Sequence, residues 1–156
     1  MKVKHTLSPI YNKNSEILIL GSMPSKLSRE KNFYYANQQN RFWKIMEELY
    51  NINFSSNNDK MEFLLKNKIA LWDVFKEVDI KGSSDSSIKN AKINNLNIIF
   101  ETANIKKIFC TGKKAYDFLI KNSNIKLPII YLPSPSSANA NYKLNDLIEI
   151  YAQIKE

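Results

Sequence analysis

Four short apolar runs divide the chain, and each one has the pattern of a buried strand. The hydrophobic residues within a run are continuous rather than alternating, which is typical of strands covered on both faces of a parallel sheet. Each run is followed by a turn and then by a helical pattern. The runs cover residues 16–20, 68–75, 105–111 and 128–132.

Segments with a hydrophobic period of 3.6 residues lie between these runs and predict helices. Apolar residues share one face of 42–49, of 61–65 and of 115–119, and the stretch 144–154 repeats the pattern. A weaker helix is predicted over 94–103. Strands that alternate with helices predict a parallel sheet with helices on both faces.

We therefore expect an α/β fold: a single three-layer domain, residues 1–156, with a central four-stranded, mostly parallel sheet flanked by helices. A chain of 156 residues fits one domain, and no repeat or linker divides it. Parallel strands bind ligands at their carboxyl ends. The turns at 21–25, 112–114 and 133–137 follow three of the strands, so we expect them to meet at one edge of the sheet.

Composition limits the chemistry that the chain can perform. There is one cysteine, Cys110, and one histidine, His5. An intrachain disulfide and a Cys/His zinc cluster are therefore excluded, and a histidine-based catalytic triad could use only His5. We expect no metal and no cofactor, so that catalysis would use carboxylates, amides, hydroxyls, lysines or backbone groups.

The charge of the chain favours a polyanionic partner. Lys and Arg number 23 against 15 Asp and Glu, which gives a formal net charge of +8. No stretch reaches the roughly 18 apolar residues of a membrane span, and the first residues lack the apolar core of a signal peptide. We expect a soluble, cytoplasmic protein without a membrane partner.

The three turns carry residues that could bind a nucleotide or DNA. Gly21 allows close approach of a flat ligand, and Pro24 stiffens its turn. The stretch 132–139 presents three hydroxyl groups on a backbone that two prolines stiffen, and Lys113 opens a helix whose free amides attract anions. A plain strand-ending turn, a proline-stiffened loop and a solvated lysine are the simpler interpretations, and each motif alone leaves that choice open.

Five aromatic residues and several amides precede the first long helix, over residues 32–43. Tyr34 and Tyr35 belong to no helical stripe, so they are better candidates for stacking on a base than Phe42, which leads into the apolar face. Asn40 could hold a water molecule, or it could only cap the helix.

In this order, these segments resemble the uracil-DNA glycosylase superfamily. Residues 21–25 stand where its first motif stands, and 132–139 resemble its second, DNA-gripping motif. Asn-Arg-Phe-Trp-Lys at 40–44 and Thr-Gly-Lys-Lys-Ala-Tyr at 111–116 are similar to segments of the mismatch-specific uracil/thymine branch. The resemblance extends from Ile17 to about Asn141.

Three further segments point more narrowly to the hypoxanthine (deoxyinosine) branch, at 34–36, 71–74 and 82–88. Most branches place an Asn or Asp just before the proline of the first motif to activate or hold the attacking water, and here that residue is Met23. The hypoxanthine branch also lacks this group and is thought to use the Asn of its Asn-x-Phe-Trp segment, a place that Asn40 fills. The second motif often begins with His but here begins with Leu132.

The resemblance implies a monofunctional DNA glycosylase, a hydrolase of base excision repair that flips a deaminated base out of DNA and hydrolyses its N-glycosidic bond. Hypoxanthine is the favoured base and uracil the second. The implied partner is DNA with a damaged or mismatched base, and we expect a monomer. The implied roles are catalysis for Asn40, base binding for Gly21, Ser22, Met23, Tyr35 and Phe42, and DNA binding for Ser25, Lys113, Ser134, Ser136, Ser137, Ala138 and Asn139.

Two other functions remain open at this point. A nucleoside or nucleotide N-glycosidase acting on free substrates would share the sheet and the base pocket but would need neither a DNA wedge nor the positive charge. A catalytically inactive DNA-binding module would fit the loss of the usual water-holding residue at Met23. The sequence assigns no role to Asp73 or Asp85.

Overall fold

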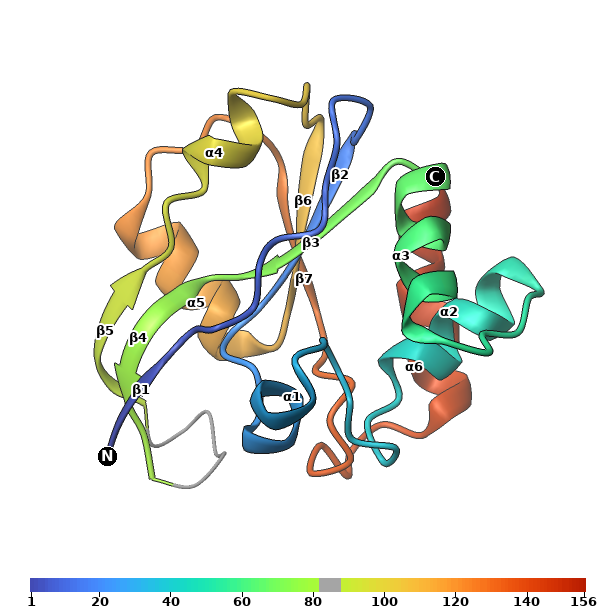
Figure 1. The fold of residues 1–156 in the computed structure, drawn as a ribbon, viewed down its shortest axis with the longest axis horizontal. Coiled ribbons are helices and arrows are strands. Elements are labelled where there is room, and N and C mark those ends of the chain that lie inside the picture. The colour runs from blue at the N-terminus through green and yellow to red at the C-terminus, as the bar shows by residue number, and fades with distance from the viewer. Residues whose placement is uncertain (82–87) are drawn as a thin grey trace.

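The four predicted strands form one parallel sheet in the computed structural model, which describes residues 1–81 and 88–156 (Figure 1). They are β2 (Ile17–Gly21), β3 (Ile69–Asp73), β6 (Lys107–Thr111) and β7 (Ile129–Leu132), in the order β3-β2-β6-β7. All three pairs of neighbours are parallel. Every residue of β3 is buried, as the continuous apolar run predicted for a strand covered on both faces.

Helices cover both faces of this sheet and complete the predicted α/β fold. On one side lie α2 (Phe42–Tyr50), α3 (Asn57–Lys66) and α6 (Leu144–Tyr151), and on the other α5 (Lys113–Asn122) and the single turn of α4 (Asn97–Phe100) (Figure 1). The helix predicted over 94–103 is thus much shorter than expected. The C-terminal helix continues as a 3-10 turn over Ala152–Lys155.

The prediction of a single strand over residues 68–75 was wrong at its end. The chain leaves the parallel sheet at Val74 and starts β4 (Phe75–Asp79), which pairs antiparallel with β1 (Lys2–Lys4) and β5 (Lys89–Ile93) in a second sheet. Buried Asn94 stabilises the change of sheet, because its amide donates to the carbonyl oxygens on either side of Val74, those of Asp73 and Phe75.

Residues 79–87 are rich in Gly, Ser and Asp, a composition that predicts a loop, and the structure describes them only in part. Asp79 is the last residue of β4, and residues 82–87, which include Asp85 and most of the segment 82–88, lie outside the described residues. Among the residues that are described, no helix combines the length and the hydrophobicity needed to cross a bilayer.

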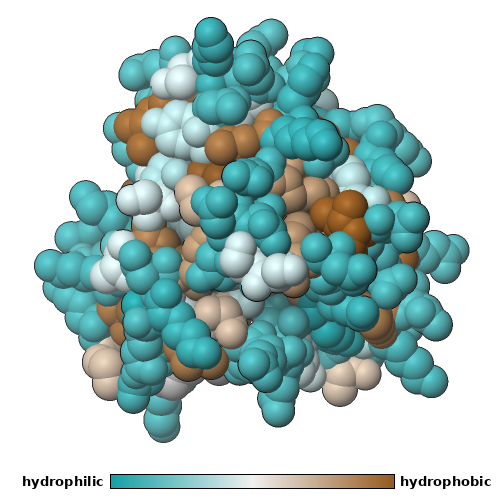
Figure 2. Space-filling model, turned by 45° about the vertical axis from the view of Figure 1, so that its right-hand side comes forward, coloured by the Kyte–Doolittle hydropathy of each residue, from teal (hydrophilic) through white to brown (hydrophobic). Residues whose placement is uncertain are grey.

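The core lies between the parallel sheet and the helices packed on it. Leu18, Leu20, Ile45 and Tyr151 are fully buried, and burial of one large apolar side chain contributes about 1.5–3 kcal/mol. On the face shown in Figure 2 hydrophilic side chains cover most of the surface, and hydrophobic ones lie in small separate patches. The packed core therefore supplies a rigid frame for the loops at the sheet edge.

Arg41 ties the loop after β7 to the start of α2. Its guanidinium donates to the carbonyl oxygens of Pro135, Ser136, Asn139 and Tyr142, and its backbone amide also donates to Pro135. A planar guanidinium has five N–H donors in a fixed fork, so one side chain can satisfy several carbonyls at once. We call this set of contacts the Arg41 clamp.

Replacing the Arg41 guanidinium with a single ammonium group should weaken the attachment of this loop to α2. We expect Arg41→Lys to lower the free energy of unfolding by roughly 1–3 kcal/mol, because a lysine ammonium cannot reach four carbonyls together. The matched control is Arg29→Lys, since Arg29 donates to a single carbonyl, that of Pro24, at 2.9 Å. Urea unfolding of both variants measures the difference, and equal losses would contradict the clamp.

Candidate active site

A cavity of about 900 Å³ opens at the edge of the sheet where β2, β6 and β7 end. The three predicted turns all contribute to its wall, so the expectation that they meet at one edge is confirmed. This edge is the lower one in Figure 1, beside α1 (Lys26–Lys31) and the chain that follows β7. Every predicted site residue except Phe42 borders the cavity.

Three oxygen atoms form the floor of the cavity around Gly21. A Cβ atom added to Gly21 would lie 2.6 Å from Asp73 Oδ1, 3.0 Å from Tyr35 Oη and 3.5 Å from Thr111 Oγ1. Asp73 stands opposite Gly21 in the pairing of β2 with β3, and the hydroxyls of Tyr35 and Thr111 are 3.3 Å apart. Glycine is required here because a side chain would fill the space that these oxygens share.

Asp73 pairs with His5, and sequence reasoning assigned no role to this pair. His5 Nε2 lies 2.8 Å from Asp73 Oδ2, and both side chains are almost completely buried. The backbone amide of His5 donates to Lys76 of β4, so the antiparallel pairing of the chain start with β4 brings His5 to the floor. The available signals were an Asp at the end of an apolar run and a lone His, but nothing in the sequence joins them.

Tyr35 forms a side wall of the cavity and Phe42 supports it from behind. The two rings are stacked with centroids 4.2 Å apart and an interplanar angle of 15°. Tyr35 has a positive φ of 51°, a backbone conformation that is uncommon for a residue other than glycine. Phe42 is fully buried and is absent from the described residues that line the cavity, so it can act on a ligand only through Tyr35.

Tyr34 borders the same cavity but is fixed in the interior. Its hydroxyl donates to the carbonyl of Ser8 at 2.7 Å, and only 3% of the residue is exposed. Burial, and then the negative charge of Asp73, raise the pKa of the Tyr34 phenol far above its ordinary value. The phenol therefore stays protonated, and of the two tyrosines Tyr35 is the more exposed.

Asn40 is half-buried at the cavity wall, and the oxygen and the nitrogen of its side-chain amide have different surroundings. Its Oδ1 accepts the backbone amide of Phe42, the first residue of α2, at 2.9 Å. Asn40 lies one residue before the N-cap position, which Arg41 holds, and this bond satisfies an amide that the helix itself leaves unpaired. Its Nδ2 has no hydrogen-bond partner within the described part of the chain. The side chain can therefore cap the helix through oxygen while the amide nitrogen remains available to the cavity.

The turn after β2 offers a backbone donor rather than a side chain. Met23 borders the cavity, and its backbone amide has no acceptor among residues 1–81 and 88–156. Ser22 lies beside it and is buried. Cys110, one residue before the end of β6, is also buried, which raises the pKa of its thiol to about 12 and makes it a poor nucleophile.

The loop after β7 is built by its own hydrogen bonds and leaves its tip exposed. Ser134 Oγ accepts the amide of Ser136, Ser136 Oγ accepts the amide of Ala138, and the Asn139 side chain donates to the Ser134 carbonyl. Ser137 and Ala138 are exposed. A rigid loop with a small exposed tip can enter a narrow space without first losing conformational freedom.

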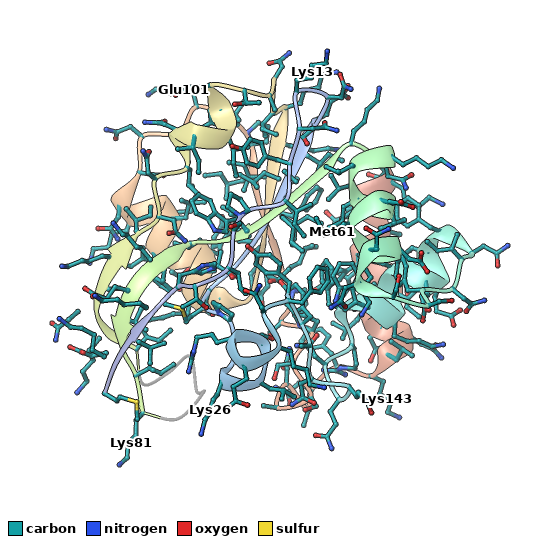
Figure 3. The ribbon with its side chains drawn as sticks, in the orientation of Figure 1. Lys13, Lys26, Met61, Lys81, Glu101 and Lys143 are labelled. Carbon is teal, nitrogen blue, oxygen red and sulfur yellow. The ribbon has the colours of Figure 1, made fainter. Side chains whose placement is uncertain are left out.

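Lysine side chains lie at one side of the cavity, where Lys113 and Lys114 border it, and elsewhere near its edge. Lys113 is 80% exposed at the start of α5, 3.7 Å from Asp117, and that helix has no side-chain cap. Ser25 caps α1 through its hydroxyl. Lys26 and Lys143 project from the same lower edge of the molecule (Figure 3). These groups can bind an anionic chain that crosses the opening.

The described residues contain no group of three or more His, Cys, Asp or Glu side chains placed to hold a metal ion. Around Gly21 and the adjoining wall, the groups that border the cavity include the Asp73 carboxylate, the hydroxyls of Tyr35 and Thr111, and the amide of Asn40. This set can bind a flat polar molecule and position a water molecule.

Comparisons with known proteins place these residues in a known family. The family model described as the uracil DNA glycosylase superfamily matches residues 8–155. A hypoxanthine DNA glycosylase from Methanosarcina barkeri is 38% identical over 121 residues, which cover 74% of this chain and 75% of the relative. A hypoxanthine DNA glycosylase from Methanosarcina acetivorans is 34% identical over 148 residues, 92% of each protein.

A solved structure also has this fold over its whole length. It is the solution NMR structure of a candidate uracil DNA glycosylase from Methanosarcina acetivorans, with a TM-score of 0.82 and 30% sequence identity. The superposition covers 100% of both chains. The parallel sheet and its flanking helices are therefore shared with this protein.

The floor of the cavity leaves no room for a side chain at residue 21. We expect Gly21→Ala to lower the free energy of unfolding by about 1–3 kcal/mol, because the added methyl group has to displace a carboxylate that His5 holds in place. In an Asp73→Ala background the same methyl group should cost clearly less. Chemical denaturation of the four proteins of this cycle measures both values, and equal costs in the two backgrounds would show that Asp73 is not the obstacle.

Proposed function

The chain belongs to the uracil DNA glycosylase superfamily, and from its site we propose that it is a monofunctional DNA glycosylase that removes hypoxanthine, with uracil as a weaker substrate. The observation that carries this proposal is the single cavity that brings together Tyr35, Asn40 and the exposed loop at 134–139. The two relatives named hypoxanthine DNA glycosylase support the choice of base.

The target base has to leave the duplex to reach Asn40, and the cavity offers what this step requires. Base flipping needs a stacking surface for the extruded base and a group that enters the space left behind. Tyr35, supported by Phe42, supplies the flat surface. The exposed residues Ser137 and Ala138 are small enough to enter the stack from the rigid loop.

Binding to the flanking phosphates would come from groups around the mouth of the cavity. Lys113, Ser25 and the hydroxyls of Ser134 and Ser136 lie in its wall. Such contacts hold DNA in register without reading its sequence. The site therefore recognises the base in the cavity and not the sequence around it.

The reaction follows from the groups at the cavity wall. The bond from the sugar C1′ to the ring nitrogen breaks, and its electron pair leaves with the base. Positive charge then develops on the sugar, where DNA phosphates stabilise it, and negative charge on the base, which the backbone amide of Met23 is placed to meet. The amide of Asn40 positions the water whose oxygen adds to C1′ and whose proton is released.

A panel of modified duplexes tests this proposal. We expect the purified protein to release hypoxanthine faster than uracil, a mismatched thymine or ethenocytosine, because Met23 offers no side-chain hydrogen bond where related enzymes hold water. Alkaline cleavage of abasic sites measures each rate. A strong preference for uracil would contradict the proposed substrate. Binding without release from any duplex would indicate an inactive DNA-binding module, and release only from free deoxyinosine a nucleoside glycosidase.

Replacement of Asn40 separates its two roles. We expect Asn40→Ala to lose on the order of a hundredfold in single-turnover excision, roughly 2.7 kcal/mol of barrier, and about 1 kcal/mol of stability with its helix cap. Asn40→Ser is the matched control, since serine restores the cap but brings no amide. It should regain the stability and remain slow. A thermal melt and an excision assay on each variant decide this, and rapid excision by Asn40→Ser would leave Asn40 as a helix cap alone.

A further inference from the structure

Tyr131 is an exposed aromatic residue at the edge of the cavity, and the steps proposed above do not use it. Among the described residues, five large hydrophobic side chains are exposed, and Tyr131, at 41%, is the only aromatic one. It borders the cavity, which the other four do not. Tyrosine has an apolar ring and a polar end, a combination that is common where proteins contact ligands.

The ring of Tyr131 is fixed in position by α5. Its centroid lies 5.9 Å from that of the Tyr116 ring, and the two planes are inclined at 71°, which is an edge-to-face contact. The backbone amide of Gly112, directly before α5, donates to the carbonyl of Leu132 at 2.7 Å. The end of β7 and the start of α5 are thus bonded together, and the ring does not have to be ordered when a ligand binds.

Two lysines of α5 border the same side of the cavity, and their charges have different partners. Lys113 lies 3.7 Å from Asp117 in an exposed ion pair. Asp117 is also close enough to Tyr131 to raise the pKa of its phenol, after burial and the nearby Tyr142. Lys114 is half-buried, and its ammonium forms no ion pair or hydrogen bond with any described residue. Its charge is therefore available to an anion from outside the protein.

An exposed aromatic ring beside an available cation is the combination by which proteins bind unpaired nucleotides. The ring stacks on a base, whatever its identity, because every base has a flat π-face, and the cation meets the phosphate. In an intact duplex the neighbours of the target base stay paired and stacked, so their faces are covered. A ring outside the base pocket can therefore stack only on a base that has left its pair.

From this arrangement we infer that Tyr131 and Lys114 form a second subsite, which holds an unpaired nucleotide next to the target. Tyr131 stacks on the base of this nucleotide and Lys114 binds its phosphate. The subsite lies outside the pocket in which Tyr35 meets the flipped base. The inference rests on the proposed glycosylase function and adds a second nucleotide that the protein contacts.

Single-stranded DNA without a damaged base isolates this subsite, because it presents unpaired bases and nothing to cleave. Fluorescence anisotropy compares its affinity with that of the matching duplex. We expect Tyr131→Leu to lose on the order of tenfold in affinity for the single strand, the usual effect of one lost base–aromatic contact, and about twofold or less for the duplex. Tyr131→Phe keeps the ring and should bind both as the wild type does.

The control for the loss of a tyrosine ring is Tyr11→Leu. Tyr11 is also partly exposed, but it is not among the residues that line the cavity. We expect this variant to bind single-stranded and duplex DNA with wild-type affinity. Thermal melts establish that every variant is folded at the temperature of the measurement.

Stacking on Tyr131 can also be observed directly. The fluorescence of 2-aminopurine falls when the base stacks, so the label is placed on either side of deoxyinosine in two single strands. We expect one of the two positions to be dimmer when bound to the wild type than when bound to Tyr131→Leu. Equal fluorescence with both proteins at both positions would overturn the inference.

The phosphate contact of Lys114 is measured by salt dependence. One phosphate contact contributes about 0.7 to the slope of log affinity against log salt concentration for single-stranded DNA. We expect Lys114→Gln to lower the slope by about this amount. Lys66→Gln, on the exposed surface of α3, is the control and should leave it unchanged. An unchanged slope for Lys114→Gln would remove Lys114 from the subsite.

Three results of the binding experiment would overturn the inference. They are wild-type affinity of folded Tyr131→Leu for the single strand, an equal loss on single strand and duplex, and a wild type that does not bind the single strand. Failure of the proposed function is seen in a different assay. A wild type that releases no base, while Tyr131 still contributes to binding of undamaged DNA, would refute the glycosylase and leave the subsite.

Discussion

The hydrogen bonds from Arg41 to the loop after β7 set the geometry on which the rest of the site depends. Asn40, immediately before it, supplies the amide that we assign to the attacking water, and Phe42, immediately after it, supports the ring of Tyr35. Three consecutive residues thus fix the Asn40 amide, the loop after β7 and the ring of Tyr35. Because α2 is anchored in the core, none of these parts can shift without the others.

The parallel sheet and its edge were predictable because their causes are local in sequence. Continuous apolar runs, as in β3, can be buried only between two layers, and a turn after each run has to lie at the carboxyl edge. The second sheet was not predictable in this way. β1 has three residues and β5 is largely exposed, so neither has a distinctive hydrophobic pattern. Their identity as strands depends on pairing with β4.

The residues of the site also fall into two groups, those that local sequence patterns predicted and those that only the structure shows. Asn40, Tyr35 and the residues of the turns lie in segments whose local patterns are unusual, and the structure gathers them. The role of Phe42 was not visible, because an aromatic residue that stacks behind another has the same pattern as one that meets a ligand. The pair of His5 and Asp73 joins residues 68 positions apart, and only the three-dimensional pairing of β1 with β4 reveals it.

The placement of His5 also gives the cavity two parts of unequal resistance to local unfolding. The Arg41 clamp is tied to the buried face of α2, so it opens only when the core opens. The floor is tied to the short strand β1, which lies at the edge of the second sheet and, among the described residues, pairs only with β4. Fraying of β1 would free the carboxylate while the sheet, the wall and the clamp stay intact. The floor of the cavity can therefore open at a lower temperature or denaturant concentration than its walls.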